Sequence, residues 1–209
     1  MAGSAEASTK VKTKTISYKI KGATGEALLD AMDRKGPRHG LTTRAIAQTG
    51  YSVDWAIDTR QRDGGCRIVR ADAVLDVTFS YPEVTGPMSP ALSRRWQKFM
   101  TGVRKHEQMH ARIARDMVAA AQRLVRNVSF VRDRSCTRSQ EEARRRINAT
   151  YAKYEARQVE FDRAEHAKDG NVDRLMSLLS RAHKTPNGPM IEISSWYGVR
   201  PVSNTLPRL

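Results

Sequence analysis

The stretch that decides the fold is SPALSRRWQKFMTGVRKHEQMHARIARDMVAAAQRLVRN, residues 89–127. Ser89 belongs to the residue types that cap helix N-termini, and Pro90 follows at the first helical position, where its missing N–H costs no hydrogen bond. After these two residues, Gly102 is the only residue that disfavours a helix before about Asn127. We therefore predict one long helix that begins after Ser89.

The predicted helix has one apolar face. Spacings of three and four residues place side chains on the same side of a helix. The apolar residues at these spacings are Trp96, Phe99, Met100, Val103, Ile113, Ala114, Met117, Ala121 and Leu124. His106 and His110 fall on the same face, so we expect the helix to bury both histidines against a β-sheet.

The sheet is expected from the residues before this helix. Residues 11–20 alternate in the period-two pattern of a half-buried strand. Residues 43–60 alternate again, with Tyr51, Val53, Trp55 and Ile57 on one side, and Asp63-Gly64-Gly65 then makes a turn into a returning strand that runs to about Phe79. We predict a small antiparallel sheet of three or four strands in the N-terminal half.

Two further helices are expected. Thr24 can cap a short helix that ends at Gly36-Pro37. After the long helix, Thr137-Arg138-Ser139-Gln140 has the form of a capping box, and a second long helix can run from there to about His166. The fold class is therefore α+β, with the sheet packed against the two long helices.

The domain boundaries follow from composition. We expect residues 1–10 to be an unstructured start that resembles a cloning remnant, because they are small and polar and lack the features of a signal peptide. Residues 11–170 form the folded domain. Residues 171–209 contain several prolines and are expected to form an irregular extension, with a short helix from Leu175 to Ala182.

The formal charge of +15 favours a polyanionic partner such as a membrane surface, an acidic cell-envelope polymer or a nucleic acid. The Lys and Arg residues are spread along the predicted helices and are not interleaved with aromatic residues, which disfavours specific nucleic-acid binding. No apolar run approaches the roughly 18 residues of a membrane-spanning helix, so no transmembrane segment is expected.

The two cysteines, Cys66 and Cys136, form no C-x-x-C pair, which disfavours a thiolate metal site. A disulfide between them could stabilise the fold by about 4 kcal/mol in an oxidising compartment. The alternative is two buried, reduced thiols. The disulfide interpretation predicts a periplasmic or secreted protein.

The segment His106-Glu107-Gln108-Met109-His110 matches the metalloprotease motif H-E-x-x-H. Four residues of helix advance about 6 Å and complete slightly more than one turn, so both imidazoles can bind one zinc ion. Glu107, beside them, would be the general base that activates a water molecule. A sheet precedes the motif helix, as in zincin-like proteases. Two imidazoles on an apolar face need polar partners, which favours a metal site over ordinary core histidines.

A zinc site of this kind needs a third protein ligand. We predict His166, a neutral nitrogen ligand at the end of the second long helix. Asp162, Glu160 and His183 remain alternatives.

Several further short sequence segments occur before and after the H-E-x-x-H motif. They are Gly64-Gly65-Cys66-Arg67, Leu75-Asp76-Val77-Thr78, Ser89-Pro90-Ala91-Leu92 with Trp96, and Cys136 after the motif helix. In the order and spacing of these segments, the sequence resembles the bacterial predicted secreted zinc-dependent proteases, a family catalogued as a domain of unknown function. The resemblance covers about residues 15–167. Members of that family usually show Tyr-Asp followed by a threonine and His-Gly, where this chain has residues 161–167, FDRAEHA.

The resemblance implies a precursor with a signal peptide, a Cys66–Cys136 disulfide, zinc on His106 and His110, and a catalytic Glu107. We therefore expect a zinc-dependent metallopeptidase that hydrolyses peptide bonds in a peptide or protein substrate, with an anionic cell-envelope surface as a further partner. Two alternatives stay open. One is a non-catalytic basic module that binds envelope polymer or nucleic acid, and the other is a zinc amidase that acts on cell-wall peptides.

Overall fold

The computed structural model describes residues 8–39 and 43–180. The elements in these ranges are β1 (Thr9–Ile20), α1 (Gly25–Lys35), β2 (Arg38–His39), β3 (Thr43–Arg44), β4 (Gln48–Arg62), β5 (Gly65–Val84), α2 (Pro90–Val125), β6 (Ser129–Phe130), α3 (Thr137–His166) and α4 (Asn171–Ser180). This confirms the mixed α+β class. His183, one of the alternatives for the third metal ligand, lies outside the described residues.

The main sheet has the order β1-β5-β4, and the short strand β6 pairs with the start of β5. β4 and β5 form the predicted antiparallel hairpin around Asp63 and Gly64, which both have positive φ values. β1 pairs with β5 in parallel, so the prediction of a purely antiparallel sheet is wrong. An alternating pattern shows which side chains share a face, but both pairing directions produce the same alternation.

β1 is also more exposed than its pattern predicts. Only Ile20 is buried and Tyr18 is half-buried, while the rest of the strand is exposed. β1 forms one edge of the sheet, whereas β5 lies between β1 and β4 and contacts α2. Every second residue of β5 from Ala71 to Tyr81 is therefore buried, and β1 contributes little to the core.

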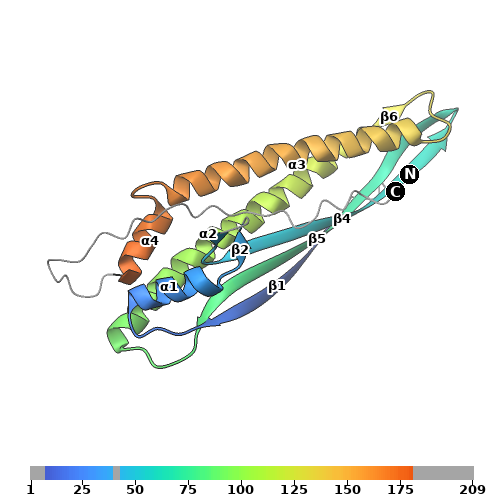
Figure 1. Ribbon diagram of the computed structural model, residues 1–209. Coiled ribbons are helices and arrows are strands. Elements are labelled where there is room, and N and C mark those ends of the chain that lie inside the picture. The colour runs from blue at the N-terminus through green and yellow to red at the C-terminus, as the bar shows by residue number, and fades with distance from the viewer. Residues whose placement is uncertain (1–7, 40–42, 181–209) are drawn as a thin grey trace.

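The long helices α2 and α3 run side by side over one face of the sheet (Figure 1). Phe99, Met117 and Val118 of α2 are almost completely buried in the shared core. Leu124, which we placed on the apolar face, is 48% exposed, and Val125 is buried instead. The buried face of α2 continues through Val118, Ala121 and Val125, at spacings of three and four residues. Leu124 therefore lies outside this face.

The helix caps agree with the sequence at two of the three predicted starts. Thr24 Oγ1 accepts a hydrogen bond from the backbone N–H of Ala27, and Ser89 Oγ accepts one from Leu92. The capping box predicted at Thr137 is wrong, because α3 is capped by Asp133. The Asp133 carboxylate accepts hydrogen bonds from the backbone N–H groups of residues 138 and 139. Cys136, which lies between Asp133 and these two residues, has a left-handed backbone conformation.

Helix α4 begins directly after the expected end of the domain and packs on α1, α2 and α3. The helix begins at Asn171, four residues before Leu175, where we predicted its start. Leu179 is completely buried, and Leu175 lies over Gly102 of α2, where an added Cβ would be 2.4 Å from Leu175 Cδ1. The single glycine in α2 thus makes room for the side chain of a helix far along the chain.

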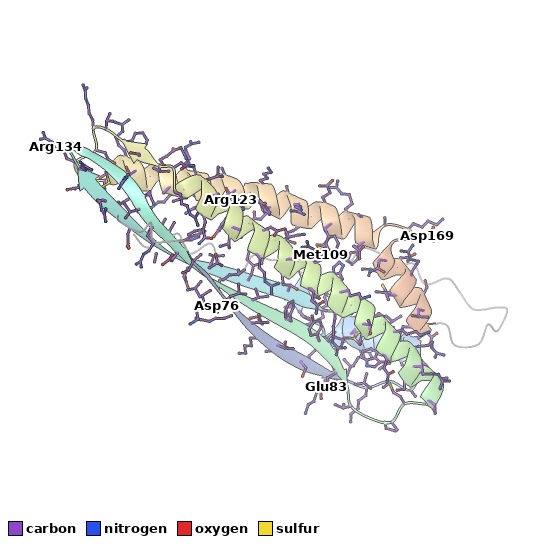
Figure 2. All side chains as sticks on the ribbon, turned by 180° about the vertical axis from the view of Figure 1, so that it is seen from behind. Asp76, Glu83, Met109, Arg123, Arg134 and Asp169 are labelled. Atoms are coloured by element: carbon purple, nitrogen blue, oxygen red, sulfur yellow. A yellow bond between two sulfur atoms is a disulfide. The ribbon has the colours of Figure 1, made fainter. Side chains whose placement is uncertain are left out.

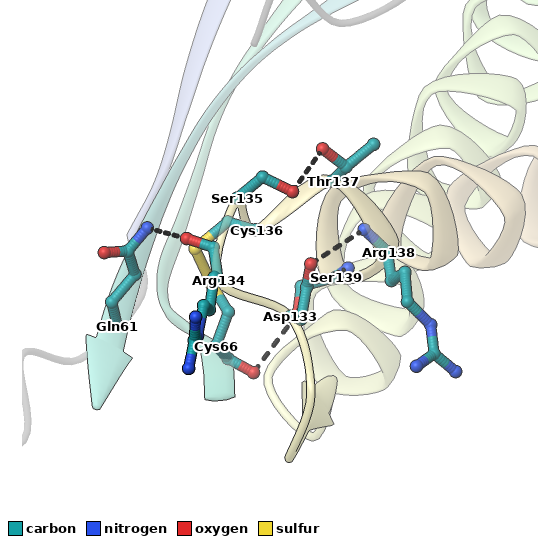
Figure 3. Close-up of a disulfide and its surroundings, with 9 residues drawn as sticks. All are labelled: Gln61, Cys66, Asp133, Arg134, Ser135, Cys136, Thr137, Arg138 and Ser139. Atoms are coloured by element: carbon teal, nitrogen blue, oxygen red, sulfur yellow. Dashed lines mark hydrogen bonds between the residues drawn. A yellow bond between two sulfur atoms is a disulfide. The ribbon is translucent and has the colours of Figure 1, made fainter. Parts of the chain in front are cut away.

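The disulfide Cys66–Cys136 is present and joins β5 to the start of α3 (Figure 3). Both cysteines are buried, and the Cα atoms are 5.3 Å apart. The bond is compatible with an extracytoplasmic location. Separately, none of the helices in the described ranges is long and apolar enough to cross a membrane.

Replacing both cysteines with serine should lower the free energy of unfolding by about 4 kcal/mol, because the bond closes a loop across a sequence separation of 70 residues and so restricts the unfolded chain. Urea denaturation of the oxidised protein and the double variant measures this difference. Adding reductant should shift the oxidised protein to the midpoint of the variant, and coincident midpoints without reductant would contradict the prediction.

Candidate metal centre

His106 and His110 lie one turn apart on α2, and their imidazole rings meet edge to face with centroids 4.8 Å apart. The two side chains are 9% and 2% exposed. Their Nε2 atoms are 3.1 Å apart. The motif helix therefore brings the two predicted ligand atoms together in the interior of the protein.

Asp162 of α3 completes this pair. Its Oδ1 lies 2.9 Å from His110 Nε2 and 3.3 Å from His106 Nε2, and its side chain is 5% exposed. Ligand atoms of all three residues lie within 4.8 Å of one another. The chain thus contains a buried His-His-Asp group that could bind a metal ion.

The separations within this group test whether zinc would fit. Zinc binds histidine nitrogen and carboxylate oxygen at about 2.0–2.2 Å in tetrahedral geometry, which places neighbouring ligand atoms about 3.3 Å apart. The three separations between Nε2, Nε2 and Oδ1 are 3.1, 3.3 and 2.9 Å. The donor atoms are therefore close enough together to bind one small cation such as zinc.

His166, which we predicted as the third ligand, lies near this group but outside it. Its ring meets the His106 ring edge to face at 5.6 Å between centroids. Asp162, one turn earlier on α3, holds the position that we expected for His166. The other carboxylate alternative, Glu160, is exposed on the outer side of α3.

The Nδ1 atoms of both histidines face oxygen acceptors. His110 Nδ1–H donates to Gln158 Oε1 at 2.7 Å, and Gln158 Nε2 donates back to the His110 carbonyl at 3.1 Å. His106 Nδ1 lies 3.4 Å from Glu165 Oε2, which also accepts from Asn171 Nδ2. A metal ion would replace the Nε2 protons that face Asp162, while a proton held on Nδ1 keeps each ring oriented as a ligand.

The charges of the group are strongly coupled. Burial alone would lower the pKa of His106, but its hydrogen bond with Asp162 and the charges of Glu107 and Asp162 raise it overall. Burial would raise the pKa of Asp162, whereas hydrogen bonds from His106 and His110 hold it well below the ordinary value. Asp162 is therefore ionised at neutral pH, as a metal ligand must be.

Glu107 is buried beside the two histidines. Thr49, near the start of β4, donates its hydroxyl hydrogen to Glu107 Oε2 at 2.6 Å. Burial raises the pKa of Glu107, and the neighbouring His106 and His110 oppose this increase. A carboxylate with a raised pKa accepts protons more readily than an exposed glutamate does.

A cavity of about 50 Å³ opens beside the group. His106, Glu107, Asp162 and His166 line it, and the segment from Arg44 to Ala47 forms another wall. The remaining walls are apolar and come from Phe99 and Val103 of α2 and Val172 and Leu175 of α4. The volume is enough for about one or two water molecules at the metal-binding atoms.

Sequence reasoning did not anticipate Thr49, Gln158 or Asn171 at this site. One signal was available for Gln158, because it precedes Asp162 by four residues and so shares its face of α3. Nothing in the pattern of β4 distinguishes Thr49 from the other residues of the strand.

Fold and site together define an α+β protein with a buried His-His-Asp group at the side of a long helix. The chain belongs to a family of bacterial proteins of unknown function (DUF922), whose model matches residues 15–170. This confirms a bacterial family of unknown function over nearly the same residues, whereas the zinc-protease part of the resemblance stays a prediction. No curated protein and no solved structure shows a significant match.

Proposed function

We propose that the protein is a zinc-dependent peptidase, with His106, His110 and Asp162 as the metal ligands. The observation that supports this proposal is the position of Glu107, whose buried carboxylate lines the same cavity as His106 and Asp162. A metal centre that only stabilised the fold would need no free carboxylate beside it.

A zinc ion bound here would act as a Lewis acid and lower the pKa of a water molecule in the fourth position. Glu107 would take a proton from that water and pass it to the leaving amine. Thr49 holds the Glu107 carboxylate in place through Oε2. His166 lines the cavity, and burial and the nearby His106 lower its pKa, so its neutral ring could donate a hydrogen bond to the substrate carbonyl.

The substrate would bind as an extended chain. Within residues 8–39 and 43–180, β4 is paired on one side only, with β5, and it begins directly after the cavity wall formed by residues 44–47. A peptide that added to this edge would pass the ligands. The apolar residues Phe99, Val103 and Leu175 would then form the wall of the cavity beside the cleaved bond.

Two histidines and a carboxylate also bind iron(II) in oxygen-activating enzymes. Glu107 favours the hydrolytic interpretation, because hydrolysis needs a proton acceptor beside the ligands. The disulfide agrees with an oxidising compartment, and we propose a periplasmic or secreted location.

Elemental analysis of the purified protein tests the metal, and cleavage of unfolded casein tests the activity. We expect about one zinc per chain, loss of cleavage with 1,10-phenanthroline, and recovery after zinc is added. Iron in place of zinc, or cleavage that resists the chelator, would contradict the proposal.

A further inference from the structure

The end of the molecule farthest from α4 carries a cluster of arginines. The β4–β5 turn, β6 and the start of α3 meet there, and Figure 2 shows Arg134 at this end. We call this region the arginine tip. Its basic residues, all exposed, are Arg60, Arg62, Arg67, Arg132, Arg134 and Arg138.

Two acids lie among these arginines. Asp63 is exposed and forms an ion pair with Arg62 at 3.2 Å between Oδ2 and Nε. Asp133 is buried, and its carboxylate accepts hydrogen bonds from Ser139 and from the backbone of Arg138. Six arginines and two acids leave the tip with a formal charge of +4.

An apolar residue projects from the same surface. Val131 is 84% exposed, the highest value among the exposed large hydrophobic residues of the described chain. Phe130, before it, is half-buried beneath the Arg138 guanidinium at 4.6 Å. Arg60, Arg62 and Arg67 share a surface hollow of about 270 Å³ with these two residues.

The tip is cross-linked and lies apart from the metal centre. The disulfide joins β5 to the start of α3 directly beneath it, and Gln61 donates a hydrogen bond to the Arg134 carbonyl (Figure 3). Asp162 lies 25 residues after Thr137 on α3, which corresponds to roughly 37 Å of helix. None of the residues proposed to bind the metal or to act in catalysis lies in this region.

We propose that the arginine tip docks the protein on an anionic phospholipid bilayer, with guanidinium groups on the lipid phosphates and Val131 inserted at the boundary of the acyl chains. Arginine binds phosphate through several N–H groups and can hold its charge in water while its stem lies on apolar surface. A soluble polyanion would satisfy the charges but offers no apolar phase for Val131. A single-stranded nucleic acid would use exposed aromatic faces, and Phe130 is covered by Arg138.

Co-sedimentation with vesicles tests the proposal. The full chain should bind vesicles of phosphatidylcholine mixed with phosphatidylglycerol, and should not bind phosphatidylcholine alone. In the double variant R132Q/R134Q the partition coefficient should fall about tenfold or more, because each basic residue at such a surface contributes severalfold to binding. Neither side chain makes an ion pair inside the described part of the chain, so the fold should be unaffected.

Two further variants separate lipid insertion from plain charge attraction. R94Q/K98Q removes the same charge from exposed positions near the start of α2 and should change the partition coefficient less than about twofold. V131S keeps every charge and should weaken vesicle binding about fivefold, since an apolar side chain no longer enters the bilayer. Equal binding of V131S and wild type, or equal losses in the two double variants, would overturn the proposal.

Discussion

Replacing Glu107 with glutamine is expected to lower kcat/KM for peptide hydrolysis by about 10²- to 10⁴-fold, the usual contribution of a general base. Glutamine has the same shape and can still accept the hydrogen bond from Thr49, but it cannot take a proton from water. The variant should therefore keep one zinc per chain and its fold. Kinetics on a labelled peptide, with elemental analysis of the same sample, measures both effects.

The matched control is Glu160→Gln, which removes the same charge from an exposed position on α3. Its activity should equal that of the wild type. If Glu107→Gln cleaved peptides at the wild-type rate, the assignment of the general base would be wrong. If it lost zinc as well, Glu107 would belong to the ligand set.

The unfolding stability of Glu107→Gln supplies an independent check. Burial raises the pKa of Glu107 above its unfolded value. This group therefore stabilises the fold at pH values below its unfolded pKa, and that contribution is lost as the pH rises through the raised pKa. Glutamine does not ionise, so the chelator-treated variant should be at least as stable as chelator-treated wild type near neutral pH.

Replacing Asp162 with asparagine is expected to weaken zinc binding by about 10²- to 10³-fold, roughly the share of one ligand in the binding free energy of a zinc site. Asparagine preserves the size of the side chain but lacks the negative charge that holds a cation. Competition with a chromogenic chelator measures the affinity. Asp162→Ala would leave two buried imidazoles without their partner, so asparagine is the better test of metal binding.

His166→Ala is the decisive comparison. Its ring lies beside the ligand group, so the variant should keep its zinc and lose part of kcat through the missing hydrogen bond to the substrate carbonyl. If His166→Ala lost zinc and Asp162→Asn kept it, the histidine would be the third ligand, as the sequence first led us to predict.

The sequence by itself determined the local parts of this protein. Ser89 and Pro90 predicted the start of α2, and the turn at Asp63 and Gly64 predicted the β4–β5 hairpin. The spacing of His106 and His110 predicted that their Nε2 atoms could meet, because helix geometry alone places residues four apart on one side. The Cys66–Cys136 disulfide, which the family resemblance implied, is also present.

Only the tertiary structure decided which side chains from other helices and strands contact His106 and His110. Asp162, Glu165 and His166 lie at spacings of three and four on α3, so all three face roughly the same way and periodicity cannot choose among them. The choice depends on how far α3 is shifted along α2, which the packing of the two helices sets. The same holds for the parallel pairing of β1 and for Thr49 beneath Glu107, because contacts between distant segments depend on register and packing, which no local pattern specifies.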